Sequence, residues 1–333
     1  MAVHLIPDMA KQFHQLFTRG AEYFSNNKEG EFTISTPSEN YLHIAMLESG
    51  WMMGSITLRD IDSSTGQAIE IGDNSLHSGR ALSGRFKKKL TVNGTPFELV
   101  ETDSCVSLSY EQLGQLANIN GFDKFVALIS DFFGRAVSLD MLRIGFNGEY
   151  AGLPTNPIEN PKGEDINTGW HAIAREFNNG SQVITEKFSL GEGGDYPHLD
   201  ALANQLIKDK IPEAFREDPR LVGLVGAELA AKERLRLFNA ADRSLSDTAA
   251  AQLLTSSIAG RFAFVPPFMP GKRLAITTLE NLHIYTQKGS RRFRAEFVDD
   301  SAEYQHAYLR NEGYALGNGF LYAAADENAI TLL

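Results

Sequence analysis

Cysteine is nearly absent from this chain of 333 residues, which contains only Cys105. A single cysteine cannot form a disulfide within the chain, and such usage is typical of a reducing compartment, with the cytoplasm as the default. Long apolar runs are absent too. Nowhere do about 18 apolar residues follow one another, and residues 1–10 lack the basic and apolar segments of a secretory signal. The sequence therefore predicts neither a membrane span nor export by that route.

Metal-binding and catalytic motifs are also missing. The eight histidines are scattered and form neither a His-x-Glu-x-x-His motif nor a Cys/His cluster. Serine is plentiful, yet the Gly-x-Ser-x-Gly turn of hydrolases does not occur. Asp299, Asp300 and Glu303 could bind a cation if they folded together, but an exposed turn is the commoner place for such residues. We therefore predict no catalytic residue, no cofactor-binding residue, no metal site and no cofactor. The histidines include His43, His77, His171, His198, His283 and His306.

Basic residues are fewer than acidic ones. The chain has 31 Lys and Arg against 42 Asp and Glu, which gives a formal net charge of −11. A protein that holds nucleic acid through phosphate contacts needs a basic binding face. Two local basic runs exist, at residues 85–89 and 288–294. We interpret them as solvated or subunit-contact charge, and we expect no tight DNA binding by the surface as a whole.

Hydrophobic residues, by contrast, make up 43% of the chain and aromatic residues 10%, enough for at least one large core in a chain of two or three structural units. The clearest element is a helix predicted over residues 122–144, whose apolar residues recur three and four apart. Gly145 and the pair Asn147-Gly148 supply stop signals for it. A shorter amphipathic helix is predicted at residues 10–24, and it must dock on another surface to bury its apolar stripe.

Two polar segments are predicted to need a partner. Residues 54–108 read as an extended hairpin, and its middle, residues 62–84, is too polar to form a core. Ordering such residues costs on the order of 1 kcal/mol or more each, so contacts with another molecule would have to offset that cost. The turn-rich residues 153–169 read as a loop that lies on a neighbour. Other predicted elements are helices at 170–177, 197–210 and 227–238, and strands at 221–225, 274–277, 282–285, 293–298 and 304–314.

Two glycine-rich stretches could hold a phosphate group through backbone amides. Residues 191–194 precede a helix but lack the Lys-Ser/Thr ending of a phosphate-binding loop, so a flexible link between two lobes is the favoured interpretation. Residues 223–226 lead from a strand to a helix without the third glycine of a dinucleotide site. An α/β enzyme acting on a phosphorylated ligand is the alternative that these stretches leave open.

The most informative feature is a series of short blocks: Ser138-Leu139-Asp140, Gly145-Phe146-Asn147-Gly148, Asn167-Thr168-Gly169-Trp170, residues 191–196, Asp218-Pro219-Arg220-Leu221-Val222, and residues 279–285. Together they resemble the major capsid proteins of Peduovirus-type tailed phages, from about residue 32 to residue 317. None of the blocks carries a nucleophile, a base and an orienting group at catalytic spacing, which favours a structural protein over an enzyme.

The resemblance implies an α+β protein with the tailed-phage capsid fold, which encapsulins and the herpesvirus shell floor share. That fold has an N-terminal arm, an extended β-hairpin loop that lies across the adjacent subunit, a peripheral domain with a long spine helix, and an axial α/β domain. The boundaries implied are an N-terminal extension at 1–31, the arm at 32–53, the extended loop at 54–108, the peripheral domain at 109–195 and 282–333, and the axial domain at 196–281.

The resemblance also implies a function. The chain would self-assemble into pentamers and hexamers that form an icosahedral head around double-stranded DNA, without sequence-specific binding and without a membrane. Assembly would occur in the host bacterial cytoplasm, with a scaffold, a maturation protease and a portal as partners and with room for a decoration protein. The protease would remove a segment that ends near Glu31-Phe32-Thr33. An encapsulin-like compartment shell is the alternative within the same fold.

Overall fold

The computed structural model describes residues 31–33, 55–71, 78–87, 92–112, 122–241, 257–298 and 300–333. The helix predicted at residues 10–24 and nearly all of the predicted N-terminal extension and arm lie outside them. None of the helices in these described stretches has the length and apolar character that crossing a membrane requires. By its contacts the chain groups into two units, the first made of Met1–Ser64, Leu99–Leu142 and Tyr285–Gly313, the second of Thr65–Glu98, Arg143–Ile284 and Tyr314–Leu333.

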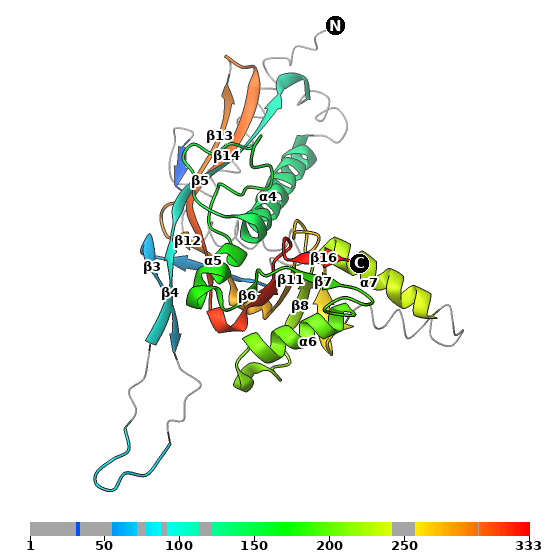
Figure 1. Cartoon of the computed structure of the whole chain (residues 1–333). Helices are drawn as coiled ribbons and strands as arrows, with labels where there is room; N and C mark the ends of the chain where they lie inside the picture. Colours follow the sequence, from blue (N-terminus) through cyan, green and yellow to red (C-terminus); the bar gives the residue numbers. More distant parts are fainter. Residues whose placement is uncertain are drawn as a thin grey trace. The chain divides into compact units, whose positions relative to one another are not determined.

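The first unit is built on a sheet whose longest strand is β14 (Glu303–Leu316) (Figure 1). β14 pairs antiparallel with both β13 (Arg292–Val298) and β5 (Val100–Ser109). Every second side chain is buried along the first ten residues of β14, the pattern of a strand with one face in the core. The strands predicted at 282–285, 293–298 and 304–314 are confirmed. The strand order is β1 (Glu31–Thr33), β13, β14, β12 (Leu282–Gln287) and β2 (Thr57–Ile61), with β5 on β14.

The long helix α4 (Phe122–Asn147) runs beside this sheet (Figure 1). The ring of Phe133 stacks on the imidazole of His306, with 4.2 Å between centroids, and meets Phe293 edge-on. The predicted helix is thus confirmed, but it ends three residues later than expected. Gly145 does not stop it, because the glycine serves packing: a Cβ there would lie 2.5 Å from the ring of Trp170.

The second unit holds a mixed sheet with β8 (Val222–Val225) and β11 (Leu274–Thr277) in its middle, both buried at every residue. Continuous apolar runs of this kind are typical of central strands. β8 pairs parallel with β10 (Arg261–Phe264) and antiparallel with β11. The order of the strands is β6 (Val183–Ile184), β15 (Ala323–Ala325), β11, β8, β10 and β9 (Ser257–Ile258).

Of the described helices that lie wholly in the second unit, the two longest were both expected from the sequence. α6 (Leu199–Lys210) begins at His198, whose Nδ1 accepts the backbone N–H of Ala201 at 3.1 Å. Its residues Leu202 and Leu206 are fully buried in the core of this sheet. α7 (Ala227–Ala241) follows β8 directly. Smaller elements are α5 (Trp170–Glu176), 3-10 turns at Phe177–Gly180, Glu213–Phe215, Leu279–Asn281 and Gly319–Leu321, and a parallel pair of β7 (Phe188–Leu190) with β16 (Ile330–Leu332).

Within the predicted extended loop, the hairpin proper is formed by β3 (Thr65–Ile71) and β4 (Val92–Glu98). Thr65 lies opposite Glu98 at its base and Ile71 opposite Val92 at the far end. β2 and β5, which flank it in sequence, pair in the sheet of the first unit instead. The contact grouping also places residues 143–195 and 314–333 with the second unit, whereas the predicted domains place both segments in the peripheral domain.

Candidate assembly surfaces and a buried polar cluster

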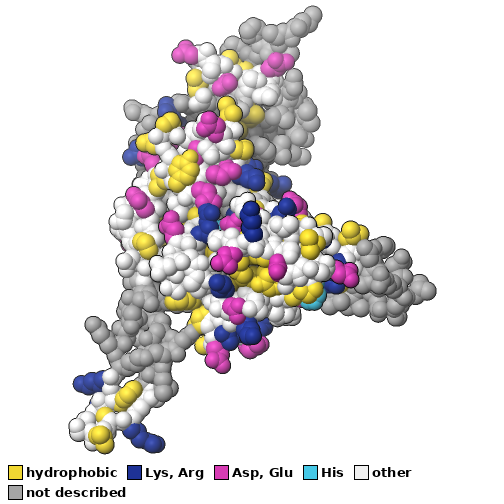
Figure 2. All heavy atoms as spheres, viewed as in Figure 1, with side chains coloured by type: hydrophobic (Ala, Val, Ile, Leu, Met, Phe, Trp, Pro, Cys, Tyr) yellow, Lys and Arg dark blue, Asp and Glu magenta, His cyan; other side chains and the backbone are white. Residues whose placement is uncertain are grey.

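The tip of the hairpin is basic and carries exposed apolar side chains. Residues 78–87 are all exposed and include Arg80, Arg85 and Lys87 but no acidic residue. Leu82 is 110% exposed, which means that its side chain touches almost nothing of its own chain. Figure 2 shows dark blue basic and yellow hydrophobic side chains together at this tip. Removing apolar surface from water is favourable, so the exposed apolar side chains make this tip a candidate contact surface.

A second candidate surface is the loop between α4 and α5. Its backbone is fixed from within: the N–H of Gly152 donates to the Asp165 carbonyl at 2.7 Å, and the N–H of Asn156 donates to Oδ2 of Asp165 at 2.5 Å. The Asn156 side chain in turn accepts the N–H of Ile158 at 3.1 Å. This ordered loop nevertheless leaves Leu153 100% exposed and Ile158 89% exposed. A loop predicted to lie on a neighbour therefore displays two large apolar side chains.

Trp170 anchors the end of that loop and brings three of the short sequence blocks together. The Trp170 indole N–H donates to the backbone carbonyl of His283 at 3.0 Å, and its ring meets Phe146 edge-on. The N–H of Gly169 donates to the Gly148 carbonyl at 3.0 Å. Blocks that lie far apart in the sequence thus share one packing site. Their role here is structural, since the contacts are ring packing and backbone hydrogen bonds.

Backbone amides of both glycine-rich stretches donate hydrogen bonds within the protein. In the first, Gly191 donates to the Tyr196 carbonyl at 2.9 Å and Gly194 donates to the Gly191 carbonyl at 3.0 Å. Gly191 has φ of 147°, and a Cβ there would lie 2.9 Å from that of Leu333. This stretch therefore accommodates Leu333, next to β16, and its amides at Gly191 and Gly194 are not available to a phosphate.

In the second stretch, the start of α7 is capped by backbone. The N–H groups of Glu228 and Leu229 both donate to the Gly271 carbonyl, at 3.0 and 3.1 Å. The N–H of Gly226 donates to the backbone carbonyl of Arg273 at 2.8 Å. The groups that would bind phosphate are thus already paired. A Cβ at Gly226 would lie 2.2 Å from the Pro270 carbonyl oxygen, so the glycine permits this close approach.

We expect Gly226→Ala to destabilise the second unit by about 3 kcal/mol, because the added methyl group collides with backbone that cannot rotate away. The matched control is Gly223→Ala in the preceding strand β8, where the nearest atom to a new Cβ is 3.8 Å away. That variant should stay within about 1 kcal/mol of the parent protein. Urea unfolding of both variants checks this, and equal stabilities would contradict the packing role of Gly226.

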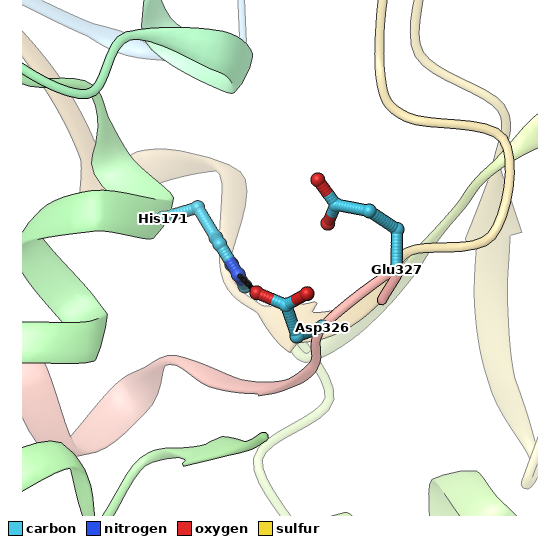
Figure 3. Close-up of side chains that lie close together, drawn as sticks. All are labelled: His171, Asp326 and Glu327. Carbon is cyan, nitrogen blue, oxygen red and sulfur yellow. Dashed lines mark hydrogen bonds and ion pairs between the residues drawn. The ribbon is translucent and has the colours of Figure 1, made fainter. Parts of the chain in front are cut away.

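A cluster of buried ionisable side chains lies in the second unit (Figure 3). His171 on α5 places Nε2 3.3 Å from Oδ2 of Asp326 and Nδ1 3.3 Å from the Tyr322 hydroxyl. Burial lowers the pKa of His171 to about 4, so the imidazole is neutral at pH 7. The hydrogen bond from His171 lowers the pKa of Asp326, which stays ionised. Because a carboxylate only accepts, Nε2 carries the proton and the Tyr322 hydroxyl donates to Nδ1.

His171, Asp326 and Glu327 offer ligand atoms that all lie within 4.8 Å of one another, and the sequence did not predict this grouping. The neighbours argue against a cation there. Arg273 donates to both carboxylate oxygens of Glu327 at 2.8 Å, and Arg175 lies 3.9 Å from Asp326. Two guanidinium groups oppose a metal ion and occupy its ligands, so the cluster fits an ion-pair and hydrogen-bond network.

The remaining charged candidates from the sequence have ordinary positions. Arg291, from the basic run at 288–294, is buried and pairs with Asp60 of its own unit, so that run is not simply solvated. Lys288 pairs with Asp62 at 3.1 Å. Asp300 is exposed, Glu303 is half-buried at the start of β14, and Asp299 lies outside the described residues. His306 is buried against aromatic rings, and His198 caps α6.

Comparison with known proteins decides the family. The chain matches the profile described as phage major capsid protein, P2 family, over residues 11–328. It belongs to that family. The resemblance inferred from the short blocks is thereby confirmed, and the protein is a major capsid protein of a phage head.

Two individual proteins and one solved structure that resemble this capsid protein support the same family. It is 26% identical over 280 residues to the protein "Capsid proteins" of Escherichia phage P2, covering 79% of this chain and 77% of that one. It is 25% identical over 279 residues to the major capsid protein of Serratia phage KSP20, covering 79% of each. The fold resembles a chain of the satellite phage P4 procapsid that includes the size determination (Sid) protein, with a TM-score of 0.76, 21% identity and 99% of both chains covered. The predicted α+β tailed-phage capsid fold is confirmed, and proteins of this kind associate with their own copies into the shell of the virion.

Proposed function

We propose that this capsid protein assembles into pentamers and hexamers that close into an icosahedral head around double-stranded DNA. The family match, which extends from residue 11 to residue 328, is the observation that carries the proposal. The exposed hairpin tip and the exposed loop before α5 support it, because both present apolar side chains that a monomer would be expected to bury. A protein whose stability belongs to the particle can leave such surfaces open in a single chain.

The proposed assignment of segments follows the implied boundaries. Residues 1–31 form an extension that a maturation protease removes, 32–53 form the arm, and 54–108 form the loop that lies across an adjacent subunit. Residues 109–195 and 282–333 form the peripheral domain, with α4 as its spine helix, and 196–281 form the axial domain. The contact between the loop of one subunit and the surface of the next is heterologous. Such contacts close into rings of five or six subunits when the subunits can bend.

The proposed partners are other copies of the chain, a scaffold, the maturation protease and a portal, with room for a decoration protein. Assembly takes place in the host bacterial cytoplasm, in keeping with the single cysteine. The chain does no catalysis in this proposal. The alternative enzyme loses support, because the amides of Gly191, Gly194 and Gly226 are paired within the protein.

Sedimentation velocity and negative-stain electron microscopy of the purified chain, alone and with a co-expressed scaffold, test the proposal. Rings of five or six subunits, or closed shells, are the expected result. A monomer or dimer under both conditions would contradict it. Shells that form without any scaffold and recruit a cargo peptide would instead favour the encapsulin-like alternative.

We expect isolated capsomers to bind DNA weakly and to release it at moderate salt. The net charge of −11 leaves few phosphate contacts, and each such contact weakens as counterions compete for the phosphates. Titration of labelled duplexes of two unrelated sequences at about 50 and about 200 mM salt checks this. Tight binding of one sequence at the higher concentration would overturn the expectation.

A further inference from the structure

Phe268 has a backbone conformation that residues with side chains rarely adopt. Its φ is 62°, which lies in the left-handed region. For a bulky L-residue this conformation is strained, because the Cβ comes too close to the following carbonyl oxygen. Strained residues persist only where surrounding contacts hold them, and they cluster at sites that switch between two arrangements. Other parts of the second unit must therefore hold Phe268 in place.

The last turn of α4 supplies those contacts. The side-chain amide of Asn147, a residue that is only 6% exposed, donates to the backbone carbonyl of Phe268 at 3.0 Å and to that of Arg143 at 2.8 Å. The guanidinium carbon of Arg143 lies 4.3 Å from the centroid of the Phe268 ring, which is a cation–π contact. Phe268 is 38% exposed, so its side chain has room to move outward. One buried amide and one cation thus hold the strained residue against the end of α4.

The residues after Phe268 connect the end of α4 to the start of α7. Arg273 donates to the backbone carbonyl of Phe146, one residue before the end of α4. The Gly271 carbonyl accepts the N–H of Glu228 in the first turn of α7 at 3.0 Å. The bond from Arg273 does not involve Phe268. It would therefore remain if Phe268 moved away, and the last turn of α4 could bend about it.

We propose that Arg143, Asn147 and Phe268 form a latch with two states, and that the subunit bends where this latch opens. In the closed state Phe268 is left-handed and bound to Asn147. In the open state its backbone relaxes to an extended conformation, the hydrogen bond from Asn147 breaks, and the last turn of α4 is released. Relaxation of the strain offsets part of the contact energy that opening loses, so both states are accessible to one chain.

This inference rests on the proposed function and adds the place where the chain bends. Subunits that occupy rings of five and rings of six must adjust their shape to each ring. A hinge consists of a few residues at the end of an element that absorb a change in backbone dihedral angles. Residues 143–147 and Phe268 have these properties within the second unit.

Two substitutions at the same position separate the backbone strain from the ring contact. Phe268→Gly and Phe268→Val both remove the ring over Arg143. Glycine adopts a left-handed conformation without strain and favours the closed state, whereas the β-branched valine favours the open one. Hydrogen exchange at residues 144–148 of the unassembled protein, measured by mass spectrometry, should be roughly tenfold faster in Phe268→Val than in Phe268→Gly.

Two further variants test the contacts and the specificity. Asn147→Leu removes the hydrogen bond at similar side-chain size, and its exchange should be as fast as that of Phe268→Val. Phe262→Val is the matched control, because Phe262 is a 68% exposed phenylalanine on β10 outside the latch, and its exchange should equal that of the parent protein. Equal exchange in Phe268→Gly and Phe268→Val would overturn the latch.

Assembly with a co-expressed scaffold tests the bending role. Phe268→Gly, which keeps the latch closed, should give roughly tenfold fewer closed shells in electron micrographs than Phe268→Val. Equal yields of closed shells from both variants would overturn the bending role and leave the proposed function intact. If the parent protein forms neither rings nor shells, the proposed function fails and the bending role fails with it. The exchange comparison on unassembled protein still decides whether the latch exists.

Discussion

Acidification from pH 7 towards pH 3 is expected to destabilise the folded chain through two buried histidines. His306 packs against the rings of Phe133 and Phe293, and the centroid of its imidazole lies 4.2 Å from the centroid of each ring. Burial there lowers the pKa of His306 to about 3. The pKa of His171 falls to about 4, again mainly through burial. Both side chains are therefore neutral in the folded state at pH 7.

The direction of the effect follows from the pH at which the folded and the unfolded state each bind protons. Both groups have a pKa of 6.5 when unfolded, so below that pH the unfolded chain takes up protons that the folded chain refuses. Stability is complete above pH 6.5 and is lost as the pH falls towards 3 for His306 and towards 4 for His171. At about 1.4 kcal/mol per pH unit, the loss of unfolding free energy reaches about 5 kcal/mol for His306 and about 3 kcal/mol for His171.

Urea unfolding between pH 7 and pH 3 measures this dependence on unassembled protein. His306→Phe should remove the larger part of the loss, because a phenyl ring can take the place of the imidazole and does not titrate. His198→Asn is the control, since it keeps a capping side chain at the start of α6 and should retain the dependence of the parent protein. An unchanged slope in His306→Phe would show that other groups carry the acid sensitivity.

Removing one partner of the buried pair Arg310–Glu312 is expected to cost about 3 to 5 kcal/mol of unfolding free energy. The two residues are 0% and 1% exposed and lie two apart on the same face of β14. Arg310 also donates to the Ser104 hydroxyl at 2.9 Å. In Glu312→Leu the guanidinium stays charged in the interior without its carboxylate, and the desolvation cost is no longer offset.

A double-mutant cycle with Arg310→Met and Glu312→Leu measures the coupling. The double variant should recover most of the stability, because two apolar side chains of similar volume need no charge partner. Arg220→Met provides the comparison at the surface, where the pair with Asp218 should be worth less than about 1 kcal/mol. Losses that simply add in the double variant would contradict the pairing.

Elements with a strong periodic pattern could be predicted from the sequence. The apolar spacing in residues 122–144 predicts α4, and the alternation in residues 304–314 predicts β14, because both patterns reflect which face of an element is buried. The end of α4 was less predictable. A glycine often follows the last residue of a helix. Gly145 instead lies inside α4, where its lack of a side chain leaves room for the ring of Trp170, which is distant in sequence.

The sequence by itself determined the periodic helices and strands, the shortage of basic charge and, through the order of its short blocks, the capsid family. These features follow from local spacing or from the chain read in order. Only the tertiary structure decided that the amides at Gly191 and Gly226 are paired within the protein, and that His171 meets Asp326 across more than 150 residues. It also decided that Leu82, Leu153 and Ile158 stay exposed. Burial and pairing depend on which segments the fold brings together, and local sequence carries little of that information.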